Sequence, residues 1–292
     1  MKKQSLLFLL IIAACFLFAA CSDDSGSSEV AADLSSDPVR VTVAGDGIEG
    51  GEVSYDLATL LDDEDNIGEY RYSVINNWPT KDFCVGKGVL LSGLLKDLGV
   101  DESFQTITFD GEDGYSVTLT REQVLAERYY YPNLQSDDTA DAEPVEMIIA
   151  LAFADNTDDL ANLEASGPCL IIGQSDIYEH NNPAFVQNIG NITISDQPAE
   201  QWQAATTYPE AGTIYAGDLI KLQHPDFGLV KLYYTLDGST PTHQSSLYNP
   251  STYQPELNVP ISISEDAVIK VLVSGYGKAD SEIATYQFKI EQ

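Results

Sequence analysis

The sequence predicts two domains, an α+β domain over residues 37–197 followed by an all-β, immunoglobulin-like sandwich over residues 208–292. Strand patterns and short helical patterns are mixed in the first part, which is typical of α+β folds. Beyond a Pro-, Gln- and Ala-containing linker at residues 198–207, only strand patterns separated by turn residues occur. The chain is long enough for each domain to bury a core of its own.

The N-terminus has the pattern of a lipoprotein signal peptide over residues 1–20. Two lysines precede an apolar run that is too short to be read as a permanent membrane span. The run ends in Phe-Ala-Ala before Cys21, an ending typical of a lipidated cysteine. Cys15 fits the same pattern but precedes apolar residues, and an ordinary cleaved secretory signal is the alternative. We predict lipidation at Cys21, a flexible tether at residues 21–36, and a membrane-anchored protein at the cell surface or the periplasmic face.

The elements of the first domain follow from periodicity and end signals. Residues 88–98 have apolar side chains at helical spacing and stop at Gly99, as a helix with a C′ glycine does. Thr120 and Gln123 have the spacing of a capping box, which predicts the start of a short helix. The Gly-Glu-Asp-Gly turn at residues 111–114 predicts a hairpin. Strands are predicted at residues 39–43, 70–75, 104–109, 115–119, 145–153, 170–173 and 191–194, and a short helix at 55–61.

The second domain is predicted from four alternating segments, at residues 219–223, 230–236, 268–273 and 283–290. The runs YYTLDGSTPT, AVIKV and GYGKADS within it resemble the chitobiase C-terminal type of β-sandwich. That resemblance covers residues 209–290 and implies an accessory or spacer domain of a surface protein. Its Tyr233, Tyr248, Tyr253 and Tyr276 either stack on sugar rings or simply cover a half-buried sheet.

Charge and cysteine content limit the partners and the chemistry. The chain has 46 acidic and 14 basic residues, a formal charge of −32, and most of the excess lies before residue 206. Because phosphate binding needs clustered Lys and Arg, this surface excludes nucleic acid as a partner. It also favours solubility. Cys84 and Cys169 remain as thiols after processing, and they either form a disulfide or stay separately buried.

Several ordered segments of the first domain resemble a known family. GVLLSGLLKDLGV, ITFDGEDGYSVTLTREQVLAERYYYPN, GPCLIIGQ and HNNPAFVQNIGNITI follow one another along the chain. Together they resemble the molybdopterin-binding oxidoreductase fold of the sulfite oxidase catalytic domain, in a divergent branch found in surface proteins. The resemblance covers residues 39–194. It implies a molybdenum cofactor held by a Cys thiolate, with basic residues on the pterin phosphate.

The sequence departs from that family where the cofactor chemistry lies. Setting Trp78 on the family's tryptophan places Val74 where the soft thiolate ligand belongs, and Val cannot ligate a metal. Cys84 would have to replace it from a different element. Cys169 stands where the family often has Arg, in a domain with seven basic residues. The signal also lacks the Arg pair that directs export of folded, cofactor-loaded proteins. We therefore expect no bound cofactor and no metal site.

The resulting hypothesis is a non-catalytic ligand-binding or interaction module on an oxidoreductase-like fold. Its partners would be the membrane, through the lipid anchor, and a cell-wall component or other extracytoplasmic ligand. His180 either marks a ligand-facing loop or is a solvated loop residue. The alternative function is a molybdopterin-dependent oxidoreductase of the sulfite oxidase type. If a cleft persists on the former cofactor face, its expected residues are Asn76, Asn77, Trp78, Tyr115, Arg128, Gln174 and His180.

Overall fold

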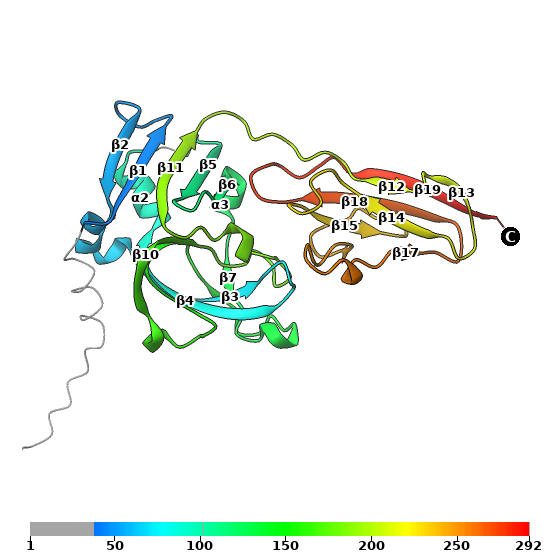
Figure 1. Cartoon of the computed structure of the whole chain (residues 1–292), viewed down its shortest axis with the longest axis horizontal. Coiled ribbons are helices and arrows are strands. Elements are labelled where there is room, and N and C mark those ends of the chain that lie inside the picture. The colour runs from blue at the N-terminus through cyan, green and yellow to red at the C-terminus, as the bar shows by residue number, and fades with distance from the viewer. Residues whose placement is uncertain (1–37, 101, 292) are drawn as a thin grey trace, which may run out of the picture.

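A computed structural model describes residues 38–100 and 102–291, so the predicted signal peptide, Cys21 and the tether lie outside the described residues. Figure 1 shows two lobes, with the first domain in blue to green and the second in yellow to red. The structure is mostly β, with 43% strand and 13% helix. This supports a β-rich fold, while the α+β class predicted for the first domain is not confirmed. Within the described residues, no helix has the length and hydropathy needed to cross a membrane.

The first domain contains a five-stranded sheet in the order β2-β1-β11-β5-β6. β1 and β11 pair in parallel although they lie at opposite ends of the domain sequence, so β11 closes the domain. The predicted hairpin is confirmed as β5 and β6, and it leads directly into the short helix α3. The bounds are β1 Arg40–Gly45, β2 Glu52–Asp56, β5 Thr106–Gly111, β6 Ser116–Thr120, β11 Ile189–Ser195 and α3 Arg121–Leu125.

A second sheet, in the order β10-β9-β4-β3, is buried on both faces. One face packs with the first sheet in the main core, around Ile149 and Leu170. The opposite face forms a separate cluster around Tyr72 and Ile148. Burial on both faces explains why β9 is a continuous apolar run rather than an alternating one. The bounds are β3 Ile67–Ile75, β4 Lys81–Leu90, β9 Ile148–Asp155, β10 Glu164–Ile171, and for the small β7-β8 pair Tyr129–Tyr130 and Glu143–Pro144.

The helix predicted at residues 88–98 is shorter in the structure, where α2 spans Leu91–Asp97. Residues 88–90 belong to β4 instead. A Cβ atom at Gly88 would lie 2.1 Å from the carbonyl oxygen of Ile149, so this glycine allows β4 and β9 to approach at a register shift. The predicted end is confirmed, because Gly99 has a φ of +69° after the last turn.

The 3₁₀ helices of the first domain connect its strands. The predicted helix at residues 55–61 is one of them, and Asp56 caps it by accepting a hydrogen bond from the Ala58 backbone N–H. Their bounds are η1 Leu57–Asp62, η2 Glu64–Asn66, η3 Leu134–Ser136, η4 Leu160–Asn162 and η5 Asn182–Ala184.

The second domain has the predicted sandwich character, with sheets in the orders β12-β14-β17 and β13-β19-β18-β15-β16 around one apolar core. Trp202 and Ala205 are buried in that core, so part of the predicted linker packs with the second domain. The bounds are β12 Thr206–Tyr208, β13 Gly212–Tyr215, β14 Leu219–Gln223, β15 Lys231–Thr235, β16 Ser246–Leu247, η6 Pro255–Leu257, β17 Ile261–Ser262, β18 Ala267–Ser274 and β19 Ala284–Glu291.

Cys84 and Cys169 are free thiols, so the disulfide considered from the sequence is not formed. Cys84 lies on β4 and Cys169 on β10, and β9 runs between these strands. Two strand spacings of about 4.8 Å each exceed the Cα separation of about 7 Å that a disulfide tolerates. Burial raises the pKa of Cys84 well above its usual value and that of Cys169 to about 12. Both residues therefore act as apolar core side chains.

Candidate functional site

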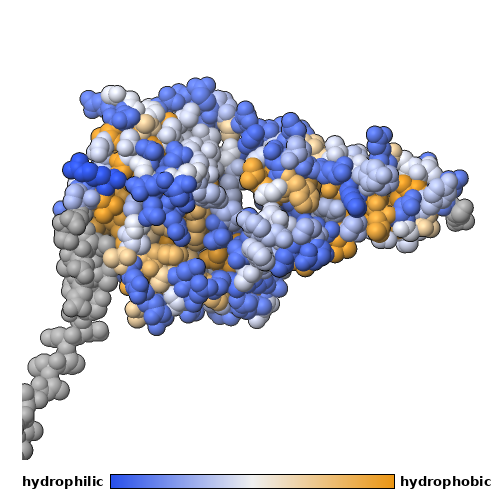
Figure 2. Space-filling view, viewed as in Figure 1, coloured by the Kyte–Doolittle hydropathy of each residue, from blue (hydrophilic) through white to orange (hydrophobic). Residues whose placement is uncertain are grey.

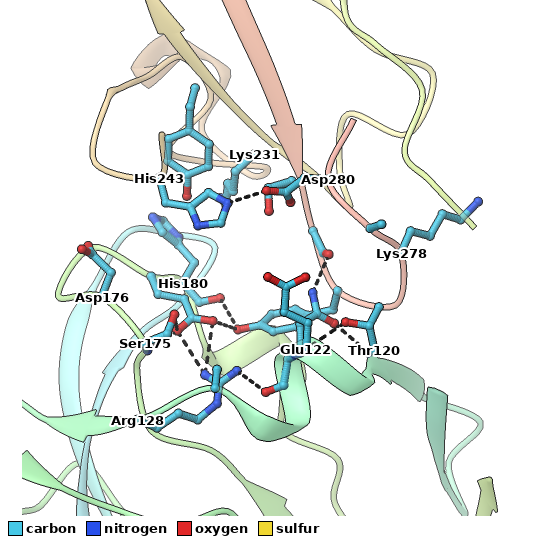
Figure 3. Close-up of a pocket in the computed structure, with 18 residues that line it drawn as sticks. Thr120, Glu122, Arg128, Ser175, Asp176, His180, Lys231, His243, Lys278 and Asp280 are labelled. Atoms are coloured by element: carbon cyan, nitrogen blue, oxygen red, sulfur yellow. Dashed lines mark hydrogen bonds and ion pairs between the residues drawn. The ribbon is translucent and has the colours of Figure 1, made fainter. Parts of the chain in front are cut away.

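The candidate site is a cavity of about 520 Å³ between the two domains. Figure 2 shows the surface hollowed where the lobes meet, and Figure 3 shows the side chains inside. We define the first-domain wall as Thr120, Glu122, Gln123, Ala126, Arg128, Ser175, Asp176, Glu179 and His180. We define the second-domain wall as Lys231, Tyr233, His243, Ser274, Gly275, Tyr276, Lys278, Ala279 and Asp280.

The capping box of α3 fixes the domains against each other. Thr120 and Gln123 form the predicted reciprocal cap at the start of the helix. The Gln123 side chain also reaches the second domain, where its Nε2 donates to the Gly275 carbonyl at 2.9 Å. Its Oε1 accepts from the Gly277 backbone N–H at 3.2 Å. Gln123 therefore both caps α3 and links the first domain to the second.

Gly277 lets the second domain approach this closely. Its φ is +83°, a region that favours glycine. A Cβ atom there would lie 3.1 Å from the Thr118 Cβ and 3.2 Å from the Thr118 carbonyl oxygen. The glycine of the GYGKADS run is thus explained by contact between the domains, a role that cannot be deduced from the second domain alone.

Arg128 is the centre of a bonded network on the first-domain wall. Its side chain is 3% exposed, and Nη1 contacts Glu179 Oε2 at 3.1 Å and the Gly173 carbonyl at 2.8 Å. Nη2 donates to the Gln123 carbonyl, while Nε has no hydrogen-bond partner among the residues that the structure describes. Glu179 also accepts hydrogen bonds from Ser175. These contacts use most of the guanidinium donors within the protein.

Glu179 connects that network to the other domain. The Tyr276 hydroxyl donates to Glu179 Oε1 at 2.9 Å. Burial opposes ionisation of Glu179, but Arg128 and the hydrogen bonds from Ser175 and Tyr276 together hold its pKa below the usual value. The carboxylate is therefore an ionised structural group at neutral pH.

His180 follows Glu179 and lies at the edge of the cavity. It is 8% exposed, and its Nδ1 lies 2.9 Å from the Asn76 carbonyl oxygen. Burial, followed by the positive charge of Lys231, lowers its pKa to about 3. The ring is neutral at physiological pH. Since a carbonyl only accepts, Nδ1 carries the proton and Nε2 is a hydrogen-bond acceptor.

Alternation along β15 produces the second-domain wall. Leu232 points into the sandwich core, so Lys231 and Tyr233 point toward the first domain. Lys231 Nζ donates to the carbonyls of Asn249 at 3.4 Å and Pro250 at 3.2 Å. Burial lowers the Lys231 pKa to about 8. This ammonium has no carboxylate partner within the described residues.

Tyr233 is 7% exposed and lines the same wall. Burial, followed by the negative charges of Glu179 and Asp176, raises the pKa of its hydroxyl. No hydrogen bond to this hydroxyl occurs among the described residues, so it is a neutral group available in the cavity.

The loop between β15 and β16 closes one side of the site. Asp237 accepts from the backbone N–H and hydroxyl of Ser239, which shapes the DGST turn. Farther along, His243 Nε2 lies 2.9 Å from Asp280 Oδ2, and this hydrogen bond raises the His243 pKa above its usual value. Gln244 crosses to the first domain and donates to Asp176 at 2.9 Å.

The structure separates the residues predicted for the cofactor face. Arg128 and His180 line the cavity, and Asn76 contacts His180 through its carbonyl. Gln174 lies beneath them, fully buried, and accepts from Ser73 while donating to the carbonyls of Ile177 and Glu179.

The remaining predicted residues serve contacts between elements. The Asn77 carbonyl accepts from Ser251 and Thr252 of the second domain. Trp78 stacks on Tyr253 with ring centroids 5.4 Å apart. Tyr115 donates to the Pro183 carbonyl and is 46% exposed, outside the cavity walls.

Sequence reasoning missed most of the second-domain wall. The sequence patterns do not single out Lys231, His243 or Lys278 as site residues, and they indicate only a stacking or covering role for Tyr233 and Tyr276. Of the four tyrosines, Tyr233 and Tyr276 line the cavity, Tyr248 is buried in the core and Tyr253 stacks on Trp78. The alternation along β15 is the signal that could have revealed Lys231, because it places this lysine on the face of the strand that points away from the sandwich core.

The residues at the expected metal position do not fit a molybdenum ligand set. Val74 is buried in the apolar cluster of the second sheet. The thiols of Cys84 and Cys169 have strongly raised pKa values in that same cluster, and burial opposes the thiolate form. Among the described residues, no group of three or more His, Cys, Asp or Glu side chains is arranged to hold a metal ion.

Comparisons with known proteins give weak likenesses. A family model described as "Fn3 associated" matches residues 220–288, most of the second domain. The crystal structure of the sulfane dehydrogenase SoxCD from Paracoccus pantotrophus is 10% identical, covers 85% of this chain and 75% of that chain, and has a TM-score of 0.34. The glycoside hydrolase domain of Endo-D from Streptococcus pneumoniae R6 is 17% identical, covers 76% and 32%, and has a TM-score of 0.22. No curated protein matches the chain.

Proposed function

We propose that this chain is a lipid-anchored extracytoplasmic protein that binds a small polar ligand between its two domains and has no catalytic activity of its own. The observation that carries the proposal is the interdomain cavity, to which both domains contribute polar side chains. Its volume of about 520 Å³ lies within the range of known small-molecule sites. In finer terms, the proposed architecture is an oxidoreductase-like first domain with a chitobiase C-terminal-like sandwich, anchored through Cys21.

The absence of catalysis is proposed from the chemistry of the walls. The Ser175 hydroxyl donates to Glu179, and within the described residues no histidine forms a hydrogen bond with it. Asp280 holds the His243 Nε2, and its own pKa is lowered by hydrogen bonds from His243 and Ser274 against the opposing effect of burial. The Ser175 hydroxyl and the His243 ring are thus each held by a carboxylate and are not paired with each other as a nucleophile and its base. The rival, a molybdopterin-dependent oxidoreductase, would need a ligand set that Val74 and the buried thiols do not supply.

The test is a thermal-shift screen of the full chain in detergent against small acids, sugars and amino acids. Ala279 lines the cavity and its side chain is exposed, so Ala279→Trp places a bulky ring there. Ala204 is exposed and does not line the cavity, so Ala204→Trp is the matched control. We expect a compound that raises the Tm of the wild type and of the control but not of Ala279→Trp. Equal stabilisation of Ala279→Trp would contradict a ligand site in the cavity.

Two further measurements test the remaining parts of the proposal. Stoichiometric molybdenum in protein isolated from its native host would contradict a non-catalytic module. Cys21→Ser is expected to move the protein from the membrane fraction to the soluble fraction, and unchanged membrane association would contradict the lipid anchor.

A further inference from the structure

One end of the cavity contains three polar groups that have capacity left for a ligand. Lys231 Nζ bonds only backbone carbonyls, the Tyr233 hydroxyl has no partner among the described residues, and His180 Nε2 is likewise unpartnered there. Figure 3 shows Lys231, His180 and His243 at the same end of the cavity. These groups face the cavity rather than the protein interior, so their free hydrogen-bonding capacity is available to a ligand with matching donors and acceptors.

Lys231 determines the charge of that ligand. It is half-buried, and within the described part of the chain no carboxylate lies within ion-pair distance of its Nζ. Among the acidic residues nearby, Glu179 pairs with Arg128 and Asp280 with His243, while Asp176 accepts a hydrogen bond from the Gln244 amide. A partly desolvated ammonium without a counter-ion is stabilised by an anionic oxygen.

The same surroundings favour one negative charge over two. Four carboxylates line the same cavity as Lys231, those of Glu122, Asp176, Glu179 and Asp280. One ammonium offsets one charge, and a second would meet these carboxylates. A carboxylate therefore suits the site better than a phosphate dianion.

His180 determines what lies beside the carboxylate. Its protonated Nδ1 faces the Asn76 carbonyl, which leaves Nε2 as an acceptor. The ligand must supply a donor to this nitrogen, and a hydroxyl group does so without adding charge. The Tyr233 hydroxyl, being both donor and acceptor, can bond either the carboxylate or a hydroxyl of the ligand.

We infer that Lys231, Tyr233 and His180 form a subsite for a hydroxylated monocarboxylate of sugar-acid size. This inference rests on the proposed function and gives its ligand a chemical class. Lys231 binds the carboxylate, Tyr233 orients it, and His180 accepts a hydrogen bond from a neighbouring hydroxyl. The cavity volume accommodates one or two sugar rings with their bound water.

The experiment is isothermal titration calorimetry of the full chain in detergent at pH 7 with four probes. D-Glucuronate has the carboxylate and the hydroxyls, D-glucose lacks the charge, cyclohexanecarboxylate keeps one carboxylate on a six-membered ring but lacks the hydroxyls, and glucose 6-phosphate replaces the carboxylate with a dianion. We expect D-glucuronate to bind at least tenfold more tightly than each of the others. No binding of D-glucuronate at millimolar concentration, or tighter binding of any other probe, would overturn the inference.

Variants assign the binding to the subsite. Lys231→Met keeps the length of the side chain but removes the ammonium, and is expected to weaken D-glucuronate binding at least tenfold. Tyr233→Phe removes only a hydroxyl and is expected to weaken it several-fold. Lys221 is exposed on β14 and outside the cavity, so Lys221→Met should bind within twofold of the wild type. Far-ultraviolet circular dichroism and the Tm of each variant establish that it is folded.

The outcomes separate the two proposals. If Lys231→Met binds D-glucuronate like the wild type while Ala279→Trp does not, the subsite is wrong and the proposed function stands. If Ala279→Trp also binds D-glucuronate normally, the ligand lies elsewhere and both proposals fail.

Discussion

The first-domain wall holds Arg128 and Glu179, whereas the second-domain wall presents Lys231 and Tyr233. The two pairs differ in how many hydrogen-bond and ion-pair partners they have within the protein. Arg128 and Glu179 bond each other and several neighbours. Lys231 bonds only two backbone carbonyls, and the Tyr233 hydroxyl has no partner among the described residues. Charged residues on an expected cofactor face can therefore be structural, while an expected accessory domain supplies two of the three open binding groups.

Removal of Arg128 is the largest effect expected. Arg128→Met leaves Glu179 without its cation, and breaking a buried pair in this way costs about 3 kcal/mol of the free energy of unfolding. Arg121 pairs with Glu102 at 3.7 Å on the exposed surface, so Arg121→Met is a matched control with a cost of about 0.5 kcal/mol or less. Urea unfolding measures both. Equal losses of unfolding free energy in the two variants would contradict a stabilising role of the Arg128 network in the first-domain wall.

The next effect concerns the contact between the walls. Gly277→Ala combines a positive φ with a Cβ that meets Thr118, whereas Gly47 has a φ of +82° and open space around it. Gly47→Ala is expected to cost about 1 kcal/mol, which is the backbone penalty alone. Gly277→Ala should cost more and expose the 275–281 loop to limited proteolysis. Indistinguishable stability and proteolysis of the two variants would contradict close docking at Gly277.

Acid stability tests the neutral state of His180. Its pKa is about 6.5 when unfolded and about 3 when folded, so the unfolded chain binds more protons between these values. The stability from this residue is therefore present above pH 6.5 and is lost as the pH falls toward 3. The slope from one such group is at most about 1.4 kcal/mol per pH unit. His180→Gln should flatten the curve of unfolding free energy between pH 6.5 and 4.5. An unchanged slope would mean that folding does not lower the pKa of His180.

The smallest effect expected is at the aromatic contact outside the cavity. Trp78 and Tyr253 are both more than half exposed and stack across the domains. A double-mutant cycle with Trp78→Ala and Tyr253→Ala should give a coupling of about 1 kcal/mol or less. Tyr215 is 65% exposed and makes no ring contact among the described residues, so the cycle of Trp78→Ala with Tyr215→Ala should give none. Ligand affinity should not change in either cycle.

Local signals predicted much of the fold. The capping box at Thr120, the hairpin before it and the strand at residues 219–223 all depend on neighbouring residues, and all are confirmed. The start of the helix at residues 88–98 was wrong because Gly88 lies against Ile149, a contact that spacing along the chain does not reveal. The absence of a disulfide also depends on contacts that spacing along the chain does not reveal, because β9 lies between the strands that carry the two cysteines.

The candidate site was predictable only in part. Arg128 and His180 were predicted because the resemblance to the oxidoreductase fold implies that they lie on the former cofactor face. Lys231 could not be predicted as a site residue, because it belongs to the site only when His180 of the other domain lies near it. The contact between the domains at Gly277 brings these two residues together. A pattern read along one strand shows which face a side chain occupies, but not which surface will cover that face.

Lys231 and Tyr233 of the second-domain wall, together with His180, are proposed to bind the ligand, while the Arg128 network holds the first-domain wall in place. Calorimetric titration of D-glucuronate into Lys231→Met, with the Tm measured on the same sample, tests it most directly. The account predicts at least a tenfold loss of affinity with a Tm within a few degrees of the wild type. Wild-type affinity in folded Lys231→Met would contradict it.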